Sequence, residues 1–222
     1  MTSSAHAIET TPHASAMTAT GVPNGKLGMW LFLASEVMFF TGLLGAYIVL
    51  RISNPHWPGS EGHLSVLMGT INTLVLICSS TTVVMALAAA EHLPAEASLP
   101  ASKTPGQAGA QAGQRLPAVR GWLALTIVLG SLFLVIKGTE YAAKFSHHIG
   151  PGTNIFWSCY FTLTGFHALH VLGGIIFNLR ILRVTWSDRL WKDQGHRLEL
   201  AGLYWHFVDI VWIFLFPLLY LL

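Results

Sequence analysis

Charged residues are scarce in this chain of 222 residues. Asp, Glu, Lys and Arg together make up 10% of it, whereas hydrophobic residues make up 53%. Soluble domains average about 25% charged residues, so the composition excludes an ordinary water-soluble domain. The net charge of +2 says little about partners, and we expect no nucleic-acid partner.

Cysteine is scarce as well. Cys78 and Cys159 lack CxxC spacing, which argues against a disulfide framework or a zinc site. Both fall in apolar segments, where we expect them to act as small buried hydrophobic residues. Residues 1–25 have no basic n-region and no apolar core, so they do not resemble a cleavable signal peptide. Their Thr, Ser, Ala and Pro content predicts a flexible cytoplasmic tail.

What the chain does have is apolar runs of about 20 residues, the length that a bilayer-spanning helix needs. Five such runs lie at about 27–50, 64–90, 121–141, 154–182 and 198–222. They predict an all-α membrane protein with a five-helix transmembrane bundle over residues 26–222. Residues 91–119, rich in Ala, Pro, Gly and Gln, are predicted to form a disordered cytoplasmic linker.

The basic residues predict the orientation of the bundle. With five spans, nine of the twelve Lys and Arg residues lie on the side of the N-terminus, and only Arg51, Lys137 and Lys144 lie on the other. Lys137 is near a helix end, where it can reach the interface by snorkelling. Because cytoplasmic loops carry the excess of Lys and Arg, we predict a cytoplasmic N-terminus and a periplasmic C-terminus.

One acidic residue, Glu36, stands inside the first apolar run. It follows Lys26 by ten residues, which is about 15 Å along a helix and half of a hydrocarbon core of about 30 Å. A charge at that depth costs at least about 2.5–3.5 kcal/mol. Glu36 is therefore expected to face the bundle interior, a partner or water, either as a proton-linked acid or as a hydrogen-bonding link between helices.

Further polar residues lie in the later runs. His167 and His170 are three residues apart, as are His206 and Asp209, and Glu140 lies close to the membrane interface. Residues at i and i+3 share a helix face, so we expect each pair to point one way. If His206 and Asp209 hydrogen-bond to each other within a packed interior, we expect Asp209→Leu to weaken subunit association, because it leaves a buried partner unsatisfied.

Three hypotheses fit these polar residues. A metal or haem site needs several ligands, and the Glu-x-x-His order of bundle di-iron sites is absent, although haem ligation by histidines stays open. A transporter or proton channel needs a relay of such groups, but no internal repeat is visible. A non-catalytic subunit would use them for packing, together with small residues for close helix contact: Gly42, Gly45, Gly165, Gly173 and Gly174.

Several long strings decide between these hypotheses. LASEVMFFTGLLGAYIVLR, INTLVLICSS, KGTEY, YFTLTGFHALHVLGG and YWHFVDIVWIFLFPLLYL occur in this order. Together they resemble cytochrome c oxidase subunit III of the haem-copper oxidase family, in its short five-span bacterial form. The longer members have two more helices before the first one here. The lipid-holding cleft that those helices form is therefore expected to be absent, or to be closed by another subunit.

The resemblance implies a role for the chain. It would be a non-catalytic subunit packed against catalytic subunit I, with subunit II in the complex, in a bacterial plasma membrane. It would hold no haem or copper itself, since those belong to the partner subunits, and it would bind phospholipid and support proton uptake. The complex would pass electrons from cytochrome c to oxygen and pump protons. Subunit III of a quinol oxidase, or an accessory chain of a nitric oxide reductase, is the alternative.

The resemblance also assigns the polar residues. Glu36 falls on the family's membrane-embedded glutamate, with a proton-related role open. The later positions are expected to make structural, lipid or partner contacts, and no residue is expected to be catalytic or to bind a metal. They are Glu140, His167, His170, His206 and Asp209, with Arg180 and Arg183 near lipid headgroups.

Overall fold

The computed structural model describes residues 23–59, 64–91, 105–185 and 195–222, with side chains from residue 116 onward in the third stretch. This part of the chain is helical and contains no strand. The helices are α1 (Asn24–Ser53), α2 (Val66–Glu91), α3 (Pro105–Ser146), α4 (Ile155–Val184) and α6 (Gly195–Phe216), which continues into the short π-helix η2 (Pro217–Leu221).

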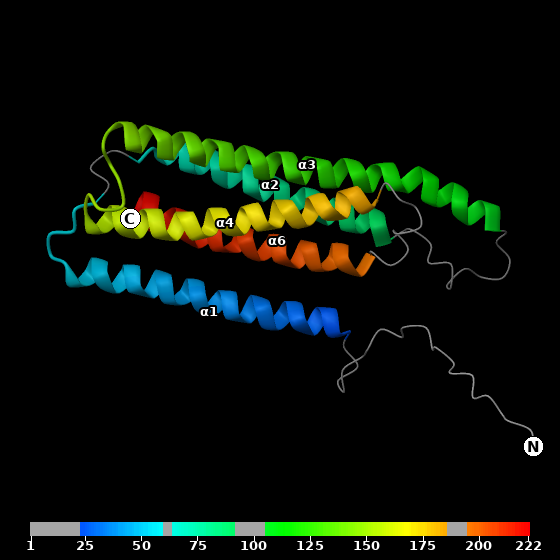
Figure 1. The fold of residues 1–222 in the computed structure, drawn as a ribbon, viewed down its shortest axis with the longest axis horizontal. Helices are drawn as coiled ribbons and strands as arrows, with labels where there is room; N and C mark the ends of the chain where they lie inside the picture. The colour runs from blue at the N-terminus through cyan, green and yellow to red at the C-terminus, as the bar shows by residue number, and fades with distance from the viewer. Residues whose placement is uncertain (1–22, 60–63, 92–104, 186–194) are drawn as a thin grey trace, which may run out of the picture.

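Five of these helices are long and apolar enough to cross a membrane, which confirms the predicted all-helical, five-span fold. Most begin and end within a few residues of the predicted runs. Helix α1 ends, α2 begins, α3 ends, α4 begins and the chain ends at one end of the bundle, here called the C-terminal end (Figure 1). The opposite end is called the N-terminal end. Which end faces the cytoplasm stays a prediction.

The predicted disordered linker is wrong over its second half. Residues 105–119 belong to α3, which is 42 residues long and extends past the other helices at the N-terminal end (Figure 1). Alanine, glutamine and arginine in this segment favour helix. Pro117 lies inside α3, although proline usually disrupts a helix interior. Residues 92–104 and nearly all of the predicted tail at 1–25 lie outside the described residues.

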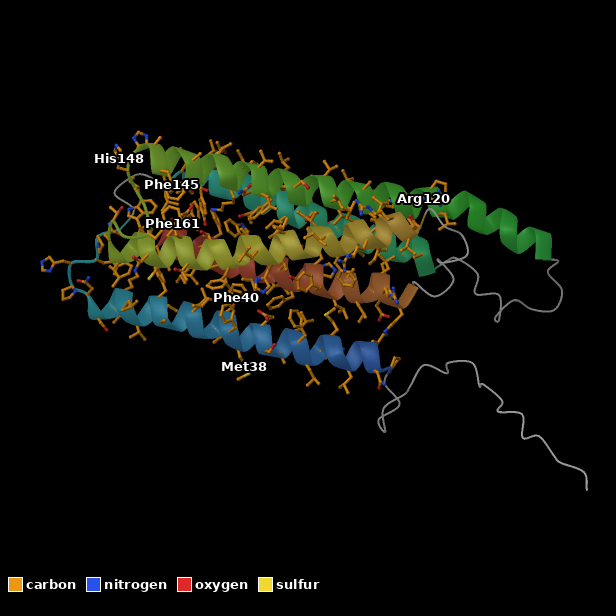
Figure 2. All side chains as sticks on the ribbon, in the orientation of Figure 1. Met38, Phe40, Arg120, Phe145, His148 and Phe161 are labelled. Carbon is orange, nitrogen blue, oxygen red and sulfur yellow. The ribbon has the colours of Figure 1, made fainter. Side chains whose placement is uncertain are left out.

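Four helices make the bundle and α1 lies along its side. Helix α2 packs against α3 and α6, and α4 packs against α3 and α6, while α1 contacts α4 and α6 (Figure 1). The apolar window of α6 is 50% buried, against 17% for that of α1. Helix α6 is therefore the central helix, and most of α1 faces outward. Figure 2 shows the two faces of α1, with Phe40 pointing into the bundle and Met38 pointing away.

Trp205 of α6 contacts the other three helices of the four-helix bundle. A Cβ atom added to Gly130 of α3 would lie 2.6 Å from the Trp205 ring, and one added to Gly174 of α4 would lie 2.7 Å from it. The indole N–H donates to Ser79 Oγ of α2 at 3.0 Å. Trp205 is fully buried, so these two glycines are what make room for its ring against α3 and α4.

We expect Gly130→Val to lower the thermal stability of the detergent-extracted chain, because overpacking a full core costs about 1–3 kcal/mol. Gly138→Val is the matched control, since a Cβ at Gly138 on the same helix meets nothing within 4 Å. Thermal unfolding monitored by size-exclusion chromatography compares the two. Equal melting temperatures for both variants would contradict the close packing of Trp205 on α3.

Two expectations about small residues are wrong. Gly42 and Gly45 of α1 do not mediate close packing within the chain, because a Cβ at either position meets nothing within 4 Å. Cys78 is exposed on α2 and Cys159 is only partly buried, so Cys78 is not a core residue. In a membrane bundle the outward face is as apolar as the core, which is why composition alone does not tell the two faces apart.

The end of the chain is tied to α1 and not left free. Tyr47 Oη donates to the Leu218 carbonyl at 3.2 Å, and the Arg51 guanidinium donates to the Leu222 carbonyl. Pro217 has no N–H to continue the α-helical ladder, and the chain widens there into η2. This turn holds Tyr220 against α3 and α4, where it becomes part of the ionic cluster described below.

Candidate functional site

Polar side chains gather at two levels of the bundle. The mid-depth polar layer comprises residues near the midpoints of their helices: Glu36, Ser80, His167, His170, His206 and Asp209. The ionic cluster lies nearer the C-terminal end and comprises Lys137, Glu140, Lys144, Tyr160 and Tyr220. In the mid-depth polar layer the hydrogen bonds join different helices. In the ionic cluster the ion pairs join residues of α3 to each other.

Glu36 and His170 form the polar contact between α1 and α4. Glu36 Oε2 lies 3.0 Å from His170 Nε2, and the two side chains are 18% and 17% exposed. Glu36 is within three residues of the middle of α1, and His170 is at the middle of α4. Glu36 therefore faces the bundle near the middle of its helix, and its partner there is His170. Its depth in a membrane stays a prediction.

The protons of this pair can be counted from the hydrogen bonds. His170 Nδ1 lies 2.8 Å from the Phe166 carbonyl oxygen, which can only accept, so Nδ1 carries a hydrogen. The remaining shared proton lies either on Glu36 or on Nε2 of His170. In both arrangements the pair as a unit is neutral, which suits a site at mid-depth where an unpaired charge is expensive.

Aromatic rings surround the Glu36–His170 pair. The Phe40 ring packs edge-on to the His170 ring with centroids 5.1 Å apart, and Phe39 packs edge-on to Phe166 at 5.2 Å. Tyr204 Oη of α6 donates to the His170 carbonyl at 3.0 Å. The pair therefore holds α1 on the bundle within an apolar setting.

No hydrogen bond joins His206 to Asp209 in the structure, so the condition for the expected effect of Asp209→Leu is not met. His206 Nδ1 instead lies 2.6 Å from Ser80 Oγ of α2. Asp209 is buried, and neither of its carboxyl oxygens has a hydrogen-bond partner among the described residues. The two side chains are three residues apart on α6, and the Ser80 hydroxyl of α2 lies close to both, with its short contact made to His206 Nδ1.

The histidines of α4 also fail to point one way. His167 is fully buried between the rings of Phe133 and Trp212, at centroid distances of 5.6 and 5.1 Å, and neither ring nitrogen has a hydrogen-bond partner among the described residues. His170 faces α1. Positions i and i+3 differ by about 60° around a helix with 3.6 residues per turn, and α4 lies between α1 and α3, so this offset sends the two rings into different interfaces.

The ionic cluster is built on one helix face. Lys137, Glu140 and Lys144 follow one another at i, i+3 and i+7 on α3. Glu140 Oε2 lies 3.0 Å from Lys137 Nζ, and Glu140 Oε1 lies 3.0 Å from Lys144 Nζ. Both lysine side chains are about 95% buried. Lys137 therefore does not snorkel outward as expected, because Glu140 offers it a carboxylate inside the bundle.

Aromatic residues complete the ionic cluster. Tyr220 Oη donates to Glu140 at 2.8 and 2.9 Å from its two oxygens. The Lys137 ammonium lies over the rings of Trp212 and Tyr220 at 4.8 and 4.9 Å, within cation–π distance. Of these residues, only Glu140 was predicted as a site residue. The Lys-x-x-Glu-x-x-x-Lys spacing was the available signal, since i+3 and i+4 neighbours pair on a helix.

Arg180 and Arg183 are exposed on the last two turns of α4 at the N-terminal end. They lie at the end of α4, away from the mid-depth polar residues of that helix. A position at a helix end suits contact with lipid headgroups. The expectation that they meet lipid stays a prediction.

Metal-ligating side chains are not clustered in the part of the chain that the structure describes. No group of three His, Cys, Asp or Glu side chains there is arranged to hold a metal ion. His170 is taken by Glu36 and the Phe166 carbonyl, while His206 is taken by Ser80. The polar atoms chiefly join one helix to another, which is the geometry of a packing element.

The comparison with known proteins agrees with the motifs. The family model described as "Cytochrome c oxidase subunit III" matches residues 7–222. This chain belongs to the cytochrome c oxidase subunit III family. All the site residues above lie within the matched range, so the mid-depth polar layer and the ionic cluster are parts of a subunit III fold.

Curated relatives cover most of this subunit III chain. "Cytochrome c oxidase subunit 3" of Thermostichus vulcanus is 34% identical over 88% of this chain and 86% of its own length. The protein of the same name from Synechocystis sp. is 37% identical over 88% of this chain and 74% of its own. "Cytochrome bo(3) ubiquinol oxidase subunit 3" of Pseudomonas aeruginosa is 30% identical over 90% and 85%. The chain is thus similar to subunits named for two different electron donors.

Proposed function

We propose that this chain is a non-catalytic subunit III of a respiratory haem-copper oxidase that passes electrons from cytochrome c to oxygen and pumps protons. The observation that carries the proposal is the family match over residues 7–222. The use of buried polar atoms for contacts between helices supports a structural role. Haem and copper belong to partner subunits, and this chain stabilises catalytic subunit I and supports its proton uptake.

The proposal includes cytochrome c as the donor because relatives of that name are 34% and 37% identical to the chain. The ubiquinol oxidase relative, at 30%, makes a quinol donor the second candidate. Subunits I and II are the proposed protein partners. The chain also binds phospholipid, and it lies in a bacterial plasma membrane with its N-terminal end in the cytoplasm, as the excess of basic residues at that end supports.

Co-purification tests the proposal. The tagged chain is extracted in mild detergent, and absorption spectra and metal content are recorded before and after the partners are stripped away. We expect haem and copper to co-purify and then to leave with a large partner. Oxygen uptake of the complex with reduced cytochrome c, compared with a reduced quinol, identifies the donor. Haem or metal that stays with the isolated chain would contradict the non-catalytic role.

A further inference from the structure

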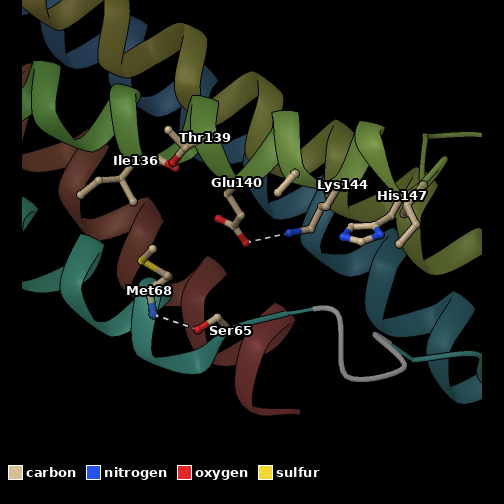
Figure 3. Close-up of a pocket in the computed structure, with 9 residues that line it drawn as sticks. Ser65, Met68, Ile136, Thr139, Glu140, Lys144 and His147 are labelled. Carbon is tan, nitrogen blue, oxygen red and sulfur yellow. Dashed lines mark hydrogen bonds and ion pairs between the residues drawn. The ribbon is translucent and has the colours of Figure 1, made fainter.

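A pocket opens beside the ionic cluster at the C-terminal end of the bundle. It has a volume of about 440 Å³ and lies between the start of α2 and the end of α3, within the usual size of a small-ligand site. Figure 3 shows Glu140 and Lys144 projecting from α3 toward it, with Met68 and Ser65 across from them. Ile136, Ala143 and Ile149 add apolar lining.

The charges beside this pocket do not cancel. Two buried ammonium groups, Lys137 and Lys144, share the single carboxylate of Glu140. Two positive charges and one negative charge leave a net charge of +1 among the described residues of the cluster. Tyr220 and Tyr160 contribute only neutral hydroxyl groups to it. A buried positive charge without a counter-charge is costly, so the cluster favours an added anion.

The depth of the pocket matches the level of lipid headgroups. The spanning part of α3, Leu116–Ser146, has 31 residues and is about 46 Å long at 1.5 Å per residue. It exceeds a hydrocarbon core of about 30 Å by roughly 8 Å at each end. Glu140 is six residues, or about 9 Å, from Ser146. The charged side of the pocket therefore lies at the boundary between the hydrocarbon and the headgroups.

We propose that this pocket binds the phosphate of a membrane phospholipid. The anionic phosphate accepts a hydrogen bond from the Lys144 ammonium and balances the net positive charge of the cluster. The glycerol and the first part of the acyl chains lie against Met68 and Ile136, toward the bilayer. The proposal locates the phospholipid that the proposed function includes, and it rests on the pocket and not on the electron donor.

An acidic side chain of a partner subunit is the competing occupant, since it too would supply an anion. The pocket favours a lipid because a positive charge at the depth of the headgroups lies beside an apolar lining, and both lie on the helix pair of α2 and α3. Thr139 and Ala143 at the pocket are exposed, so their substitution changes the pocket without entering the ionic cluster. Inorganic phosphate is also an anion, but it has no apolar part to contact the apolar lining.

Lipid titration by native mass spectrometry tests the proposal in the complex that the tagged chain purifies with. The complex is delipidated with detergent, and dioleoylphosphatidylglycerol is added back. We expect one tight site per chain, weakened at least tenfold by Ala143→Phe, which fills the pocket. Ala142→Phe is the matched control, because Ala142 is an exposed neighbour outside the lining. Thr139→Phe repeats the test if Ala143→Phe fails to fold.

Two further probes separate the sources of the anion. Dioleoylglycerol has the same acyl chains without phosphate. Its affinity should be the same for Ala143→Phe and Ala142→Phe. Inorganic phosphate should bind at least tenfold more weakly than the lipid. Equal lipid affinity in Ala143→Phe and Ala142→Phe would overturn the proposal. Tight inorganic phosphate binding without lipid binding, or loss of a partner subunit at unchanged lipid affinity, would overturn it too. The haem spectrum of the parent complex tests the proposed function separately.

Discussion

Replacing Glu140 by alanine is expected to remove about 3–5 kcal/mol of stability, the usual effect of leaving a buried charge without its partner. The variant leaves two ammonium groups, those of Lys137 and Lys144, buried about 95% without a carboxylate, and it leaves the Tyr220 hydroxyl without its acceptor. Helix α3 would then lose its carboxylate contact with Tyr220 and keep the hydrogen bond from Lys137 to the Tyr220 hydroxyl. Thermal unfolding and the amount of chain in the membrane measure the loss.

The chain offers a matched control for this result. Glu199 pairs with Lys26 at 2.6 Å, but these side chains are 38% and 33% exposed, and exposed ion pairs contribute only about 0–1 kcal/mol. Glu199→Ala should therefore stay close to the parent. The double variant Glu140→Gln with Lys144→Met should recover part of the loss, because it restores the original net charge of the cluster. Equal stability of Glu140→Ala and Glu199→Ala would show that the cluster is not buried.

The five helices could be predicted because the bilayer sets their length. An apolar run of about 20 residues has few alternatives in lipid, and the described helices follow the predicted runs. The start of α3 could not be predicted in the same way. Residues 105–119 lie outside the apolar run and contain Gly and Pro, which indicate a linker, yet they continue the helix. The Ala, Gln and Arg residues of this segment favour helix while its Gly and Pro residues oppose it, so composition does not decide between a helix and a linker.

The partners of the polar residues were harder to predict than their depth. The position of Glu36 in its run gives its level, but only the packing of α1 on α4 identifies His170 as its partner. In the same way, the position of Lys137 near a helix end predicts snorkelling. Only the packing of the bundle shows that Glu140 and Tyr220 lie inside and draw the lysine inward. Periodicity within one helix places residues only to within about 60°, which was too coarse for His167 and His170, and the rotation of one helix against another depends on glycines and large rings far apart in sequence.

Glu36→Lys is expected to abolish assembly of the chain into its complex. The variant replaces the carboxyl that meets His170 Nε2 at 3.0 Å with a cation near the middle of α1. A lysine at mid-depth costs at least about 2.5–3.5 kcal/mol on insertion scales, and the lysine also offers His170 no acceptor. Helix α1, which is 17% buried in its apolar window, has little other packing to offset the loss.

Glu36→Gln is expected to assemble almost normally, because the glutamine amide keeps the shape of glutamate and can donate to Nε2 of a neutral His170. Met38→Lys is the control for depth alone, since Met38 is 76% exposed on the outward face of α1 and makes no contact with the pair. Co-purification of each variant with its haem-containing partner is the measurement. If Glu36→Lys assembled as well as Glu36→Gln, the acid could not lie at mid-depth against α4, and the neutral Glu36–His170 pair would not be what holds α1 to the bundle.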